Sequence, residues 1–377
     1  MKNKNKKPKA LIVIGLGFGD EGKGLTVDWL CEKAKNPIVI RFSGGQQAGH
    51  TVEREGIKHT FSNFGAGTLL GISTYFSEHT TFYPVGIKYE KLILNKKGFN
   101  PKLIIHPMSR ITTPWDVFEN RACKTTLSNG SCGQGVGKTM KRNEGTYQLR
   151  AIDLFNEDIF RAKLSQIEKN YYIRKFKLTD ALSKEISEFH FAIKELISDI
   201  NALNFEIADY NYLKQFKTLI FEGSQGVMLD MDHGIFPNVT YANTTSKNAM
   251  EICDKLKIKD RHVYGVTRAY STRHGKGDGE YEGEPIELLD TKHEININNK
   301  YQGEFLCTKL DYRKLEYAYI IENLYSKKYK HSLMVTCCNQ VSSKEDFDLG
   351  LFNFGSSLKN VYKSYERSAY SIVHSIY

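Results

Sequence analysis

The strongest constraint on the fold is the segment of residues 11–24, LIVIGLGFGDEGKG. A run of apolar, mostly β-branched residues predicts a buried strand, and it leads directly into a glycine-rich turn. Such a turn lets backbone N–H groups converge on a phosphate, and the helix expected from residue 25 adds its positive N-terminal dipole there. The segment therefore predicts a strand–turn–helix unit that binds a nucleotide phosphate.

This turn departs from the usual phosphate-binding loop in two ways. It ends in the G-K of a G-x-x-x-x-G-K pattern, but Gly24 stands where that pattern has the Ser or Thr that holds Mg²⁺. Asp20 and Glu21 lie inside the turn, where their charges would repel a triphosphate. A carboxylate at this place is useful if it binds the metal or accepts a proton from a second substrate. We therefore expect Asp20 to be catalytic.

Length and composition narrow the class of protein. The 377 residues, 40% of them hydrophobic, are enough for a large α/β domain with a substantial core. A net charge of +10 suits anionic small molecules such as nucleotides, and the lack of a long arginine-rich run argues against a specific nucleic-acid partner. Seven cysteines without a CxxC pair, no secretory signal and no membrane-spanning run predict a cytoplasmic protein. We expect a basic tail at residues 1–10 and a single domain at residues 11–377.

Two further strands are predicted to end in glycine-rich loops. Residues 37–42 (PIVIRF) lead into SGGQQAGHT, which displays His50, and residues 218–223 (TLIFEG) lead into a turn that displays Gln225. Ligands in open α/β sheets bind at the carboxyl ends of the strands, so both loops should face the same site as residues 19–24. A carboxamide both donates and accepts hydrogen bonds, as the recognition of a purine edge requires.

Three other segments carry weaker signals. The sequence SNGSCGQGVGK at residues 128–138 could expose backbone donors to an anion or serve as a flexible surface linker. Residues 151–204 predict a charged helical layer. Asp230, Asp232 and His233 could hold a metal, but their spacing fits no standard ligand set and favours a structural network.

Four blocks together resemble the signature sequences of the adenylosuccinate synthetase family, and they occur in the same order. They are GDEGKG at residues 19–24, GGQQAGHT at 44–51, FEGSQGVMLDMDHGIFPNVTYANTT at 221–245 and AYSTRHGKG at 269–277. The resemblance implies an α/β, P-loop-like fold with a largely parallel central sheet flanked by helices, and a homodimer. It also implies a ligase of purine biosynthesis that joins L-aspartate to IMP, hydrolyses GTP, and requires Mg²⁺.

The resemblance assigns roles to individual residues. The acid at the position of Asp20 takes the N1 proton of IMP and binds Mg²⁺, the metal also contacts the carbonyl of Gly49, and the imidazole of His50 acts as a general acid beside O6. The implied catalytic residues are Asp20, His50 and Gln225. The implied nucleotide-binding residues are Gly19, Glu21, Gly22, Lys23, Gly24, Gly49, Thr51, Asn339 and Gly355. The implied substrate-binding residues are Gln47, Ser131, Cys132, Thr240, Arg273 and Lys300.

Three departures from the family pattern bear on specificity. The arginine-rich loop that holds aspartate corresponds to residues 292–309, which contain no arginine, so Arg273, Lys300 and Lys309 are the candidates for that task. Arg142 is the nearest candidate for the arginine that the partner subunit lends to the IMP phosphate. Asn339 stands where the family has the aspartate that reads guanine, which favours ATP as an alternative donor.

These departures leave two alternatives to the leading hypothesis. One is the same activation chemistry with another amine donor, or with dGMP in place of IMP, as in the phage-type relatives. The other is a nucleotide-binding sensor without turnover. The presence of Asp20 and His50 argues for an enzyme, whereas the loop without arginine argues for a sensor.

Overall fold

The computed structural model describes residues 7–123, 130–172, 178–201, 204–275, 283–290, 294, 301–341 and 358–375. Within these residues the centre is a ten-stranded sheet in the order β16-β15-β14-β11-β1-β10-β2-β5-β7-β9. All neighbouring strands are parallel except β15 and β16. The strands are β1 (Lys9–Gly15), β2 (Pro37–Arg41), β5 (Thr74–Phe76), β7 (Leu103–Ile105), β9 (Phe205–Ile207), β10 (Thr218–Gly226), β11 (Asp260–Arg268), β14 (Lys330–Thr336), β15 (Leu358–Ser364) and β16 (Ile372–Ser375).

Strand β1 lies at the centre of this sheet because it is apolar on both faces. Leu11 and Val13 pack into one hydrophobic core, and Ile12 and Ile14 pack into a second core on the opposite face. Alternate residues of a strand point to opposite faces, so a continuous apolar run buries both. The helices around the sheet are α1 (Lys23–Lys33), α2 (Pro84–Lys96), α3 (Pro114–Ala122), α5 (Val136–Glu144), α6 (Glu157–Gln166), α7 (Asp180–Asn201), α8 (Lys247–Lys255) and α9 (Tyr312–Ser326).

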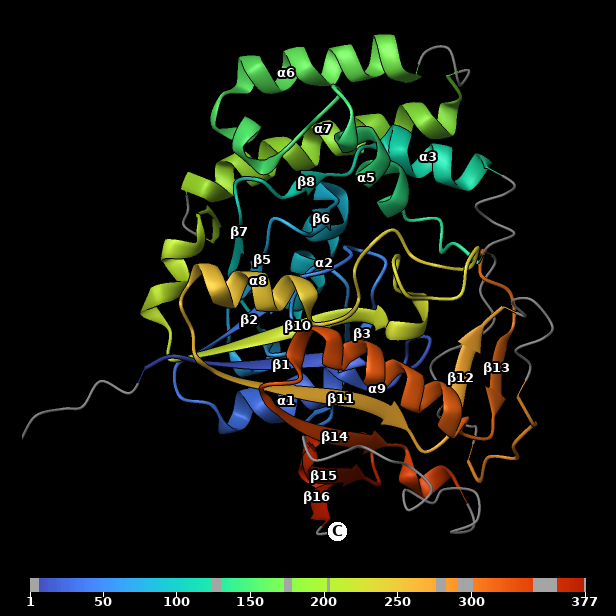
Figure 1. Ribbon diagram of the computed structural model, residues 1–377. Coiled ribbons are helices and arrows are strands. Elements are labelled where there is room, and N and C mark those ends of the chain that lie inside the picture. Colours follow the sequence, from blue (N-terminus) through green and yellow to red (C-terminus); the bar gives the residue numbers. More distant parts are fainter. Residues whose placement is uncertain are drawn as a thin grey trace, which may run out of the picture.

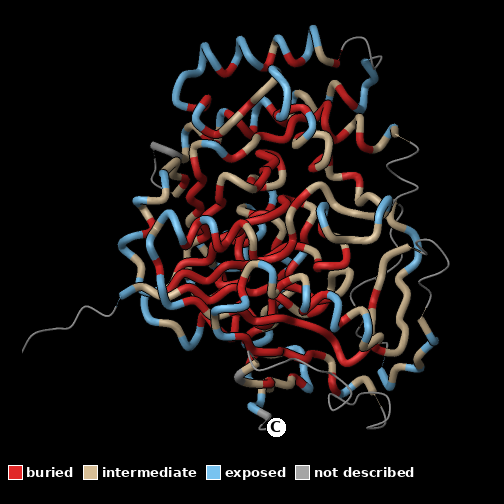
Figure 2. Tube along the Cα trace, viewed as in Figure 1, coloured by how far each residue is buried: buried red, intermediate tan, exposed pale blue. Residues whose placement is uncertain are grey.

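The helices form a covering layer on each face of the sheet. Helices α8 and α9 contribute to the core that contains Ile12, and α1 contributes to the core that contains Leu11 (Figure 1). Helices α3, α5, α6 and α7 gather at the end of the molecule near β7, and the buried residues concentrate on the strands (Figure 2). The predicted α/β fold with a largely parallel sheet flanked by helices is thus confirmed, including the helical layer after residue 151.

Three small sheets lie beside the main one. They are β3 (His50–Arg54) with β4 (Ile57–Phe61), β6 (Thr81–Phe82) with β8 (Arg110–Ile111), and β12 (Ser271–His274) with β13 (Phe305–Thr308). The β3–β4 and β12–β13 pairs are antiparallel and follow the carboxyl ends of β2 and β11. They therefore extend from the edge of the sheet at which the sequence predicts the site.

Three features of the structure bear on the expectations about membrane segments, disulfides and the basic tail. Within the described ranges, no helix is long and apolar enough to cross a membrane. All seven cysteines are free, and Cys337 and Cys338 form no bridge. At the N-terminal end, β1 begins at Lys9 and Ala10 is fully buried, so the ordered strand includes two residues of the expected basic tail.

Candidate active site

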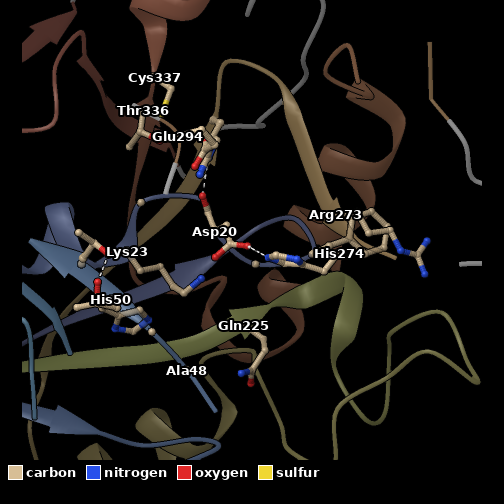
Figure 3. Close-up of a pocket in the computed structure, with 18 of the residues that line it drawn as sticks. Asp20, Lys23, Ala48, His50, Gln225, Arg273, His274, Glu294, Thr336 and Cys337 are labelled. Carbon is tan, nitrogen blue, oxygen red and sulfur yellow. Dashed lines mark hydrogen bonds and ion pairs between the residues drawn. The ribbon is translucent and has the colours of Figure 1, made fainter. Parts of the chain in front are cut away.

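One cavity of about 970 Å³ opens at the carboxyl ends of β1, β2, β10, β11 and β14 (Figure 3). Its volume suits a nucleotide together with a second small substrate. It brings together twelve of the residues that the sequence assigns to the site. They are Gly19, Asp20, Gly22, Lys23, Gly24, Gln47, Gly49, His50, Thr51, Gln225, Arg273 and Asn339.

Asp20 is held in position by contacts to both its backbone and its side chain. Its φ of 63° lies in the left-handed region, which is uncommon for a residue with a Cβ and is typical of functional sites. The Nε of Arg268 donates to its carbonyl oxygen at 2.6 Å, and the Nε2 of His274 lies 3.1 Å from its Oδ2. Burial alone would raise the pKa of Asp20, but the hydrogen bond and charge of His274, with Arg268 and Lys23, hold it below its usual value. The carboxylate is therefore a charged acceptor in the cavity wall.

Glu21 points the other way, into the body of the loop. Its carboxylate accepts hydrogen bonds from the backbone N–H groups of Gly17 at 3.0 Å and Gly19 at 2.7 Å, and it pairs with the Lys23 ammonium. The side chain does not line the cavity. Glu21 thus fixes the shape of the loop with its side chain, which explains how an acid is accommodated beside a phosphate-binding turn.

His50 is oriented by a buried acid. Its Nδ1 contacts Oε1 of Glu222, and the same carboxylate accepts the N–H of Ala66 at 3.2 Å. Burial would raise the pKa of Glu222, but the charge and hydrogen bond of His50 and the charge of Arg41 hold it below its usual value. Burial also lowers the pKa of His50. The ring therefore donates from Nδ1, and its Nε2 is buried in the cavity wall without a partner among the described residues.

Gln225 lies across the cavity from this pair. It has a φ of 50°, and its Oε1 accepts a hydrogen bond from Nε2 of Gln47 at 3.3 Å. Figure 3 shows its side chain extending from the end of β10 away from Asp20. The site therefore combines a carboxylate and an ammonium from the segment after β1, an imidazole from the segment after β2 and a carboxamide from the end of β10. That set can transfer protons and stabilise the negative charge of a phosphoryl group.

The model of the adenylosuccinate synthetase family matches residues 12–326 of this chain. The chain belongs to the adenylosuccinate synthetase family. It is 33% identical over 299 residues to the adenylosuccinate synthetase of Clostridium botulinum strain Eklund 17B, in a match that covers 74% of this chain and 66% of the relative. It is 32% identical over 295 residues to the enzyme of Bordetella avium strain 197N, with coverages of 75% and 66%. The chain thus spans just under two thirds of the length of these relatives.

Two solved structures share the fold of this family member. The fully ligated adenylosuccinate synthetase of Plasmodium falciparum has a TM-score of 0.65 and 21% identity, and the match covers 87% of this chain and 77% of that one. The succinoaminodeoxyadenylate synthetase of cyanophage S-2L, bound to dGMP and dATP as an energy donor, has a TM-score of 0.65 and 16% identity. That match covers 98% of this chain and 95% of the phage protein.

Several residues that the family resemblance assigns to substrate lie outside the cavity lining. The Ser131 hydroxyl bonds to the Asn120 side chain at 2.9 Å, the Thr240 N–H donates to a backbone carbonyl at 2.8 Å, and burial raises the pKa of the Cys132 thiol. Ser131, Cys132 and Thr240 remain predictions as substrate-binding residues. Lys300 and Gly355 lie outside the described residues.

The arginine candidates have different surroundings. Arg273 lines the cavity, and its guanidinium stacks 4.7 Å from the centre of the Phe18 ring. Arg142 is fully buried and pairs with Asp116 at 2.8 Å, so in this chain it is bound to the protein interior and is not available to a phosphate. The expectation that Arg142 replaces the phosphate-binding arginine is therefore wrong for this conformation, since a buried, paired guanidinium holds α5 to α3 instead.

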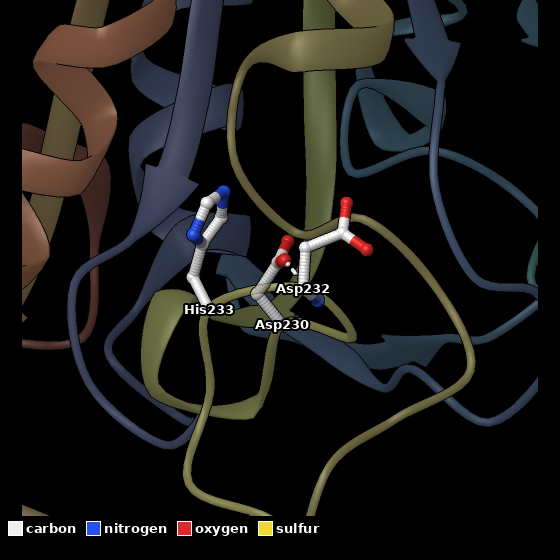
Figure 4. Close-up of side chains that lie close together, drawn as sticks. All are labelled: Asp230, Asp232 and His233. Carbon is white, nitrogen blue, oxygen red and sulfur yellow. Dashed lines mark hydrogen bonds between the residues drawn. The ribbon is translucent and has the colours of Figure 1, made fainter.

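The side chains of the acidic cluster after β10 bond to other groups of the protein. Ligand atoms of Asp230, Asp232 and His233 lie within 4.8 Å of one another (Figure 4). Asp230 accepts backbone N–H bonds, Asp232 pairs with Lys247 at 3.0 Å, and the Nε2 of His233 lies 2.7 Å from the hydroxyl of Tyr325. These contacts support a structural network, as the sequence favours.

Three functional neighbours were not among the residues predicted from the sequence. Glu222 orients His50, and His274 and Arg268 hold Asp20. An acid at the end of an otherwise apolar strand was a signal for Glu222, because a buried carboxylate requires a partner. His274 and Arg268 carried no comparable signal, since only the parallel pairing of β1 with β11 brings them to the loop.

Proposed function

We propose that the protein is a Mg²⁺-dependent carbon–nitrogen ligase that activates the 6-oxo group of a purine nucleotide. In the leading version it transfers the γ-phosphoryl group of GTP or ATP to O6 of IMP, and L-aspartate then replaces the phosphate to give adenylosuccinate. The observation that carries this proposal is the placement of Asp20 and His50 in one cavity, with the Lys23 ammonium close enough to influence both.

The two side chains match two neighbouring atoms of the hypoxanthine edge. N1–H is a donor and needs an acceptor, which the Asp20 carboxylate supplies, and O6 lies one bond further along the ring. The unpartnered Nε2 of His50 is on the opposite side of the cavity from the Asp20–His274 pair (Figure 3). A purine that places N1 at Asp20 therefore directs O6 toward His50 and the Lys23 charge.

The proposed chemistry then proceeds in two steps. Asp20 accepts the N1 proton, O6 attacks the γ-phosphorus, and the bond to the nucleoside diphosphate breaks. The amine of the second substrate attacks C6, the C6–O bond breaks, and inorganic phosphate leaves with a proton from the amine nitrogen. Asp20 then releases the N1 proton to solvent. Lys23 and the N-terminus of α1 offset the charge on the transferred group.

His50 takes part through its cavity-facing nitrogen. In the free protein burial keeps the ring neutral, but an anionic phosphoryl group within contact distance favours the imidazolium. The charged ring donates from Nε2 to O6, while the Nδ1–H stays on Glu222. General acid–base groups of this kind contribute about 10²- to 10⁴-fold to a rate.

The residues present fit a magnesium ion. The cavity wall offers a charged carboxylate at Asp20 and backbone oxygen at Gly49, and Mg²⁺ prefers hard oxygen ligands and substrate phosphates. Asp20 and Gly49 would hold the ion, and the ion would neutralise charge on the phosphates. The side-chain hydroxyl that a standard P-loop supplies is replaced by Gly24.

The amine donor and the phosphoryl donor contact the outer parts of the cavity. Arg273 lies on β12 and lines the cavity. Its guanidinium can pair with a dicarboxylate, which supports aspartate or a related amino acid. Asn339 lies exposed at the rim after β14, where its amide can both donate to and accept from a purine base. It therefore permits ATP as well as GTP.

A second candidate keeps the activation step and changes the purine. The phage protein that matches 98% of this chain is described with dGMP and dATP, and its length resembles that of this chain more closely than the longer relatives do. In this version the 2-amino purine dGMP replaces IMP and ATP or dATP is the donor.

We further propose that the protein is a cytoplasmic homodimer, which sedimentation equilibrium would test.

One incubation series tests these alternatives. Purified protein is mixed with Mg²⁺, with GTP or ATP, and with IMP, GMP or dGMP, each with and without aspartate, and phosphate release and product mass are followed. An aspartate-dependent mass gain on IMP supports the leading version, and the same gain on dGMP supports the second. Nucleotide binding without phosphate release or product in any mixture would overturn the enzymatic proposal in favour of a sensor.

A further inference from the structure

We propose that His274 is a positioning residue for the reaction: its imidazole fixes one oxygen of the Asp20 carboxylate so that the other oxygen is presented to the purine. The inference rests on the function proposed above. Its basis is the contact between Nε2 of His274 and Oδ2 of Asp20 at 3.1 Å, made from β12, the strand that follows the Arg268 contact to the Asp20 backbone.

The segment from the end of β11 through β12 contacts the catalytic loop at three points. Arg268 donates from Nε to the carbonyl of Asp20 at 2.6 Å, and Thr272 donates from Oγ1 to the carbonyl of Gly19 at 3.3 Å. His274 adds the contact to the side chain. Thr272 and His274 are two residues apart on a strand, so they share the face that meets the loop.

The surroundings of His274 direct its action to Asp20. The ring lies 5.0 Å from the ring of Phe305 on the paired strand β13, which limits its rotation. Its Nδ1 is buried and has no hydrogen-bond partner in the described part of the chain. Within that part, the contact through Nε2 is therefore the polar interaction that sets the orientation of the ring.

As a result, the two carboxylate oxygens of Asp20 have different surroundings. Oδ2 is bonded to His274, and the second oxygen lies on the side of Lys23 and the cavity (Figure 3). Without His274 the carboxylate could rotate about χ2, which is a broad torsion for aspartate. Its second oxygen would then no longer be held toward N1–H. The left-handed backbone at Asp20 fixes where the side chain starts, and His274 fixes where it ends.

Three substitutions separate the positioning of Asp20 from general support of the paired strands β12 and β13. His274→Ala removes the contact. His274→Gln places an amide N–H near the former Nε2, whereas His274→Asn is one methylene shorter and cannot reach Oδ2. We expect the Ala and Asn variants to lose about 10- to 100-fold in kcat, as is usual when a partner that orients a ligating or reacting group is removed. The Gln variant should recover most of the rate, and KM for the phosphoryl donor should change little.

The matched control is His374→Ala, which removes a histidine bonded to Asn360 at 2.9 Å on β16, outside the cavity lining. It should leave kcat unchanged. Calorimetric titration with IMP, without donor, gives a readout that needs no turnover: the Ala variant should bind more weakly and the Gln variant should regain affinity. A His274→Ala enzyme with wild-type kcat and IMP affinity would overturn the inference, as would equal impairment of the Gln and Asn variants with lowered melting temperatures. A wild-type protein that neither binds nor phosphorylates any purine nucleotide would instead overturn the proposed function.

Discussion

Replacing Glu222 by Gln tests whether the buried acid behind His50 supports both the fold and the proposed catalysis. The carboxylate is fully buried, contacts Nδ1 of His50, and accepts the N–H of Ala66 at 3.2 Å. Arg41 is also buried, and its guanidinium donates to backbone carbonyls at 3.4–3.5 Å. Glu222 is thus a buried counter-charge for the Arg41 guanidinium.

The expected magnitudes follow from this burial. Removing one partner of a buried charge pair costs about 3–5 kcal/mol, and a glutamine keeps part of the hydrogen bonding. We therefore expect the free energy of unfolding to fall by about 3 kcal/mol. The amide can also turn its NH₂ group toward His50 and favour the wrong tautomer, so kcat should fall about 10²-fold, the lower end for loss of a general acid.

Chemical denaturation and phosphate release measure the two effects separately. Glu90→Gln is the matched control, because Glu90 is a second buried glutamate that accepts from the N–H of Asn63 at 2.7 Å and lies 3.4 Å from a ring nitrogen of His59. It lies outside the cavity lining, so its substitution should lower stability and leave kcat of the folded protein unchanged. A Glu222→Gln protein with wild-type kcat would refute the role assigned to the Glu222–His50 pair.

Three further predictions concern specificity and pH. Asn339→Asp should raise the ratio of kcat/KM for GTP to that for ATP by about tenfold or more, since a carboxylate accepts both guanine N–H groups; an unchanged ratio would place the base elsewhere. Arg273→Ala should raise KM for aspartate about tenfold or more and leave donor-dependent IMP phosphorylation intact, as initial-rate kinetics would show. Glu322 is fully buried against Ser246, and burial raises its pKa from 4.5 to about 7. The stability that its folded-state proton provides is present below pH 4.5 and is lost as the pH rises to 7, so Glu322→Gln should remove roughly 3 kcal/mol of pH dependence from the unfolding free energy over that interval. Wild-type and Glu322→Gln proteins whose unfolding free energies change equally with pH across this interval would contradict the raised pKa.

The parallel sheet was predictable because its strands carry their own signals. Residues 11–14, 38–40 and 219–221 are continuous apolar runs that lead within a few residues to a glycine, which is typical of strands buried on both faces and ending at a site. Those three runs become adjacent strands in the order β1-β10-β2. The shared cavity of Asp20, His50 and Gln225 follows from that adjacency.

The order of the outer strands and the contacts between loops were not predictable in the same way. Arg268 and His274 reach Asp20 only because β11 pairs with β1, a pairing between segments about 250 residues apart that no local pattern encodes. Glu21 was predicted to line the phosphates, whereas its side chain turns inward to the N–H groups of its own loop. That direction depends on the backbone of the turn, which composition and spacing do not define.

The measurement that tests the central claim most directly is phosphate release by Asp20→Asn in the presence of Mg²⁺, donor and IMP. The asparagine keeps the size of the side chain but cannot take the N1 proton. We expect IMP-dependent phosphate release to fall at least about 10²-fold while the nucleotides still bind. An Asp20→Asn protein that releases phosphate at the wild-type rate would contradict the claim that this carboxylate and His50 act on one purine.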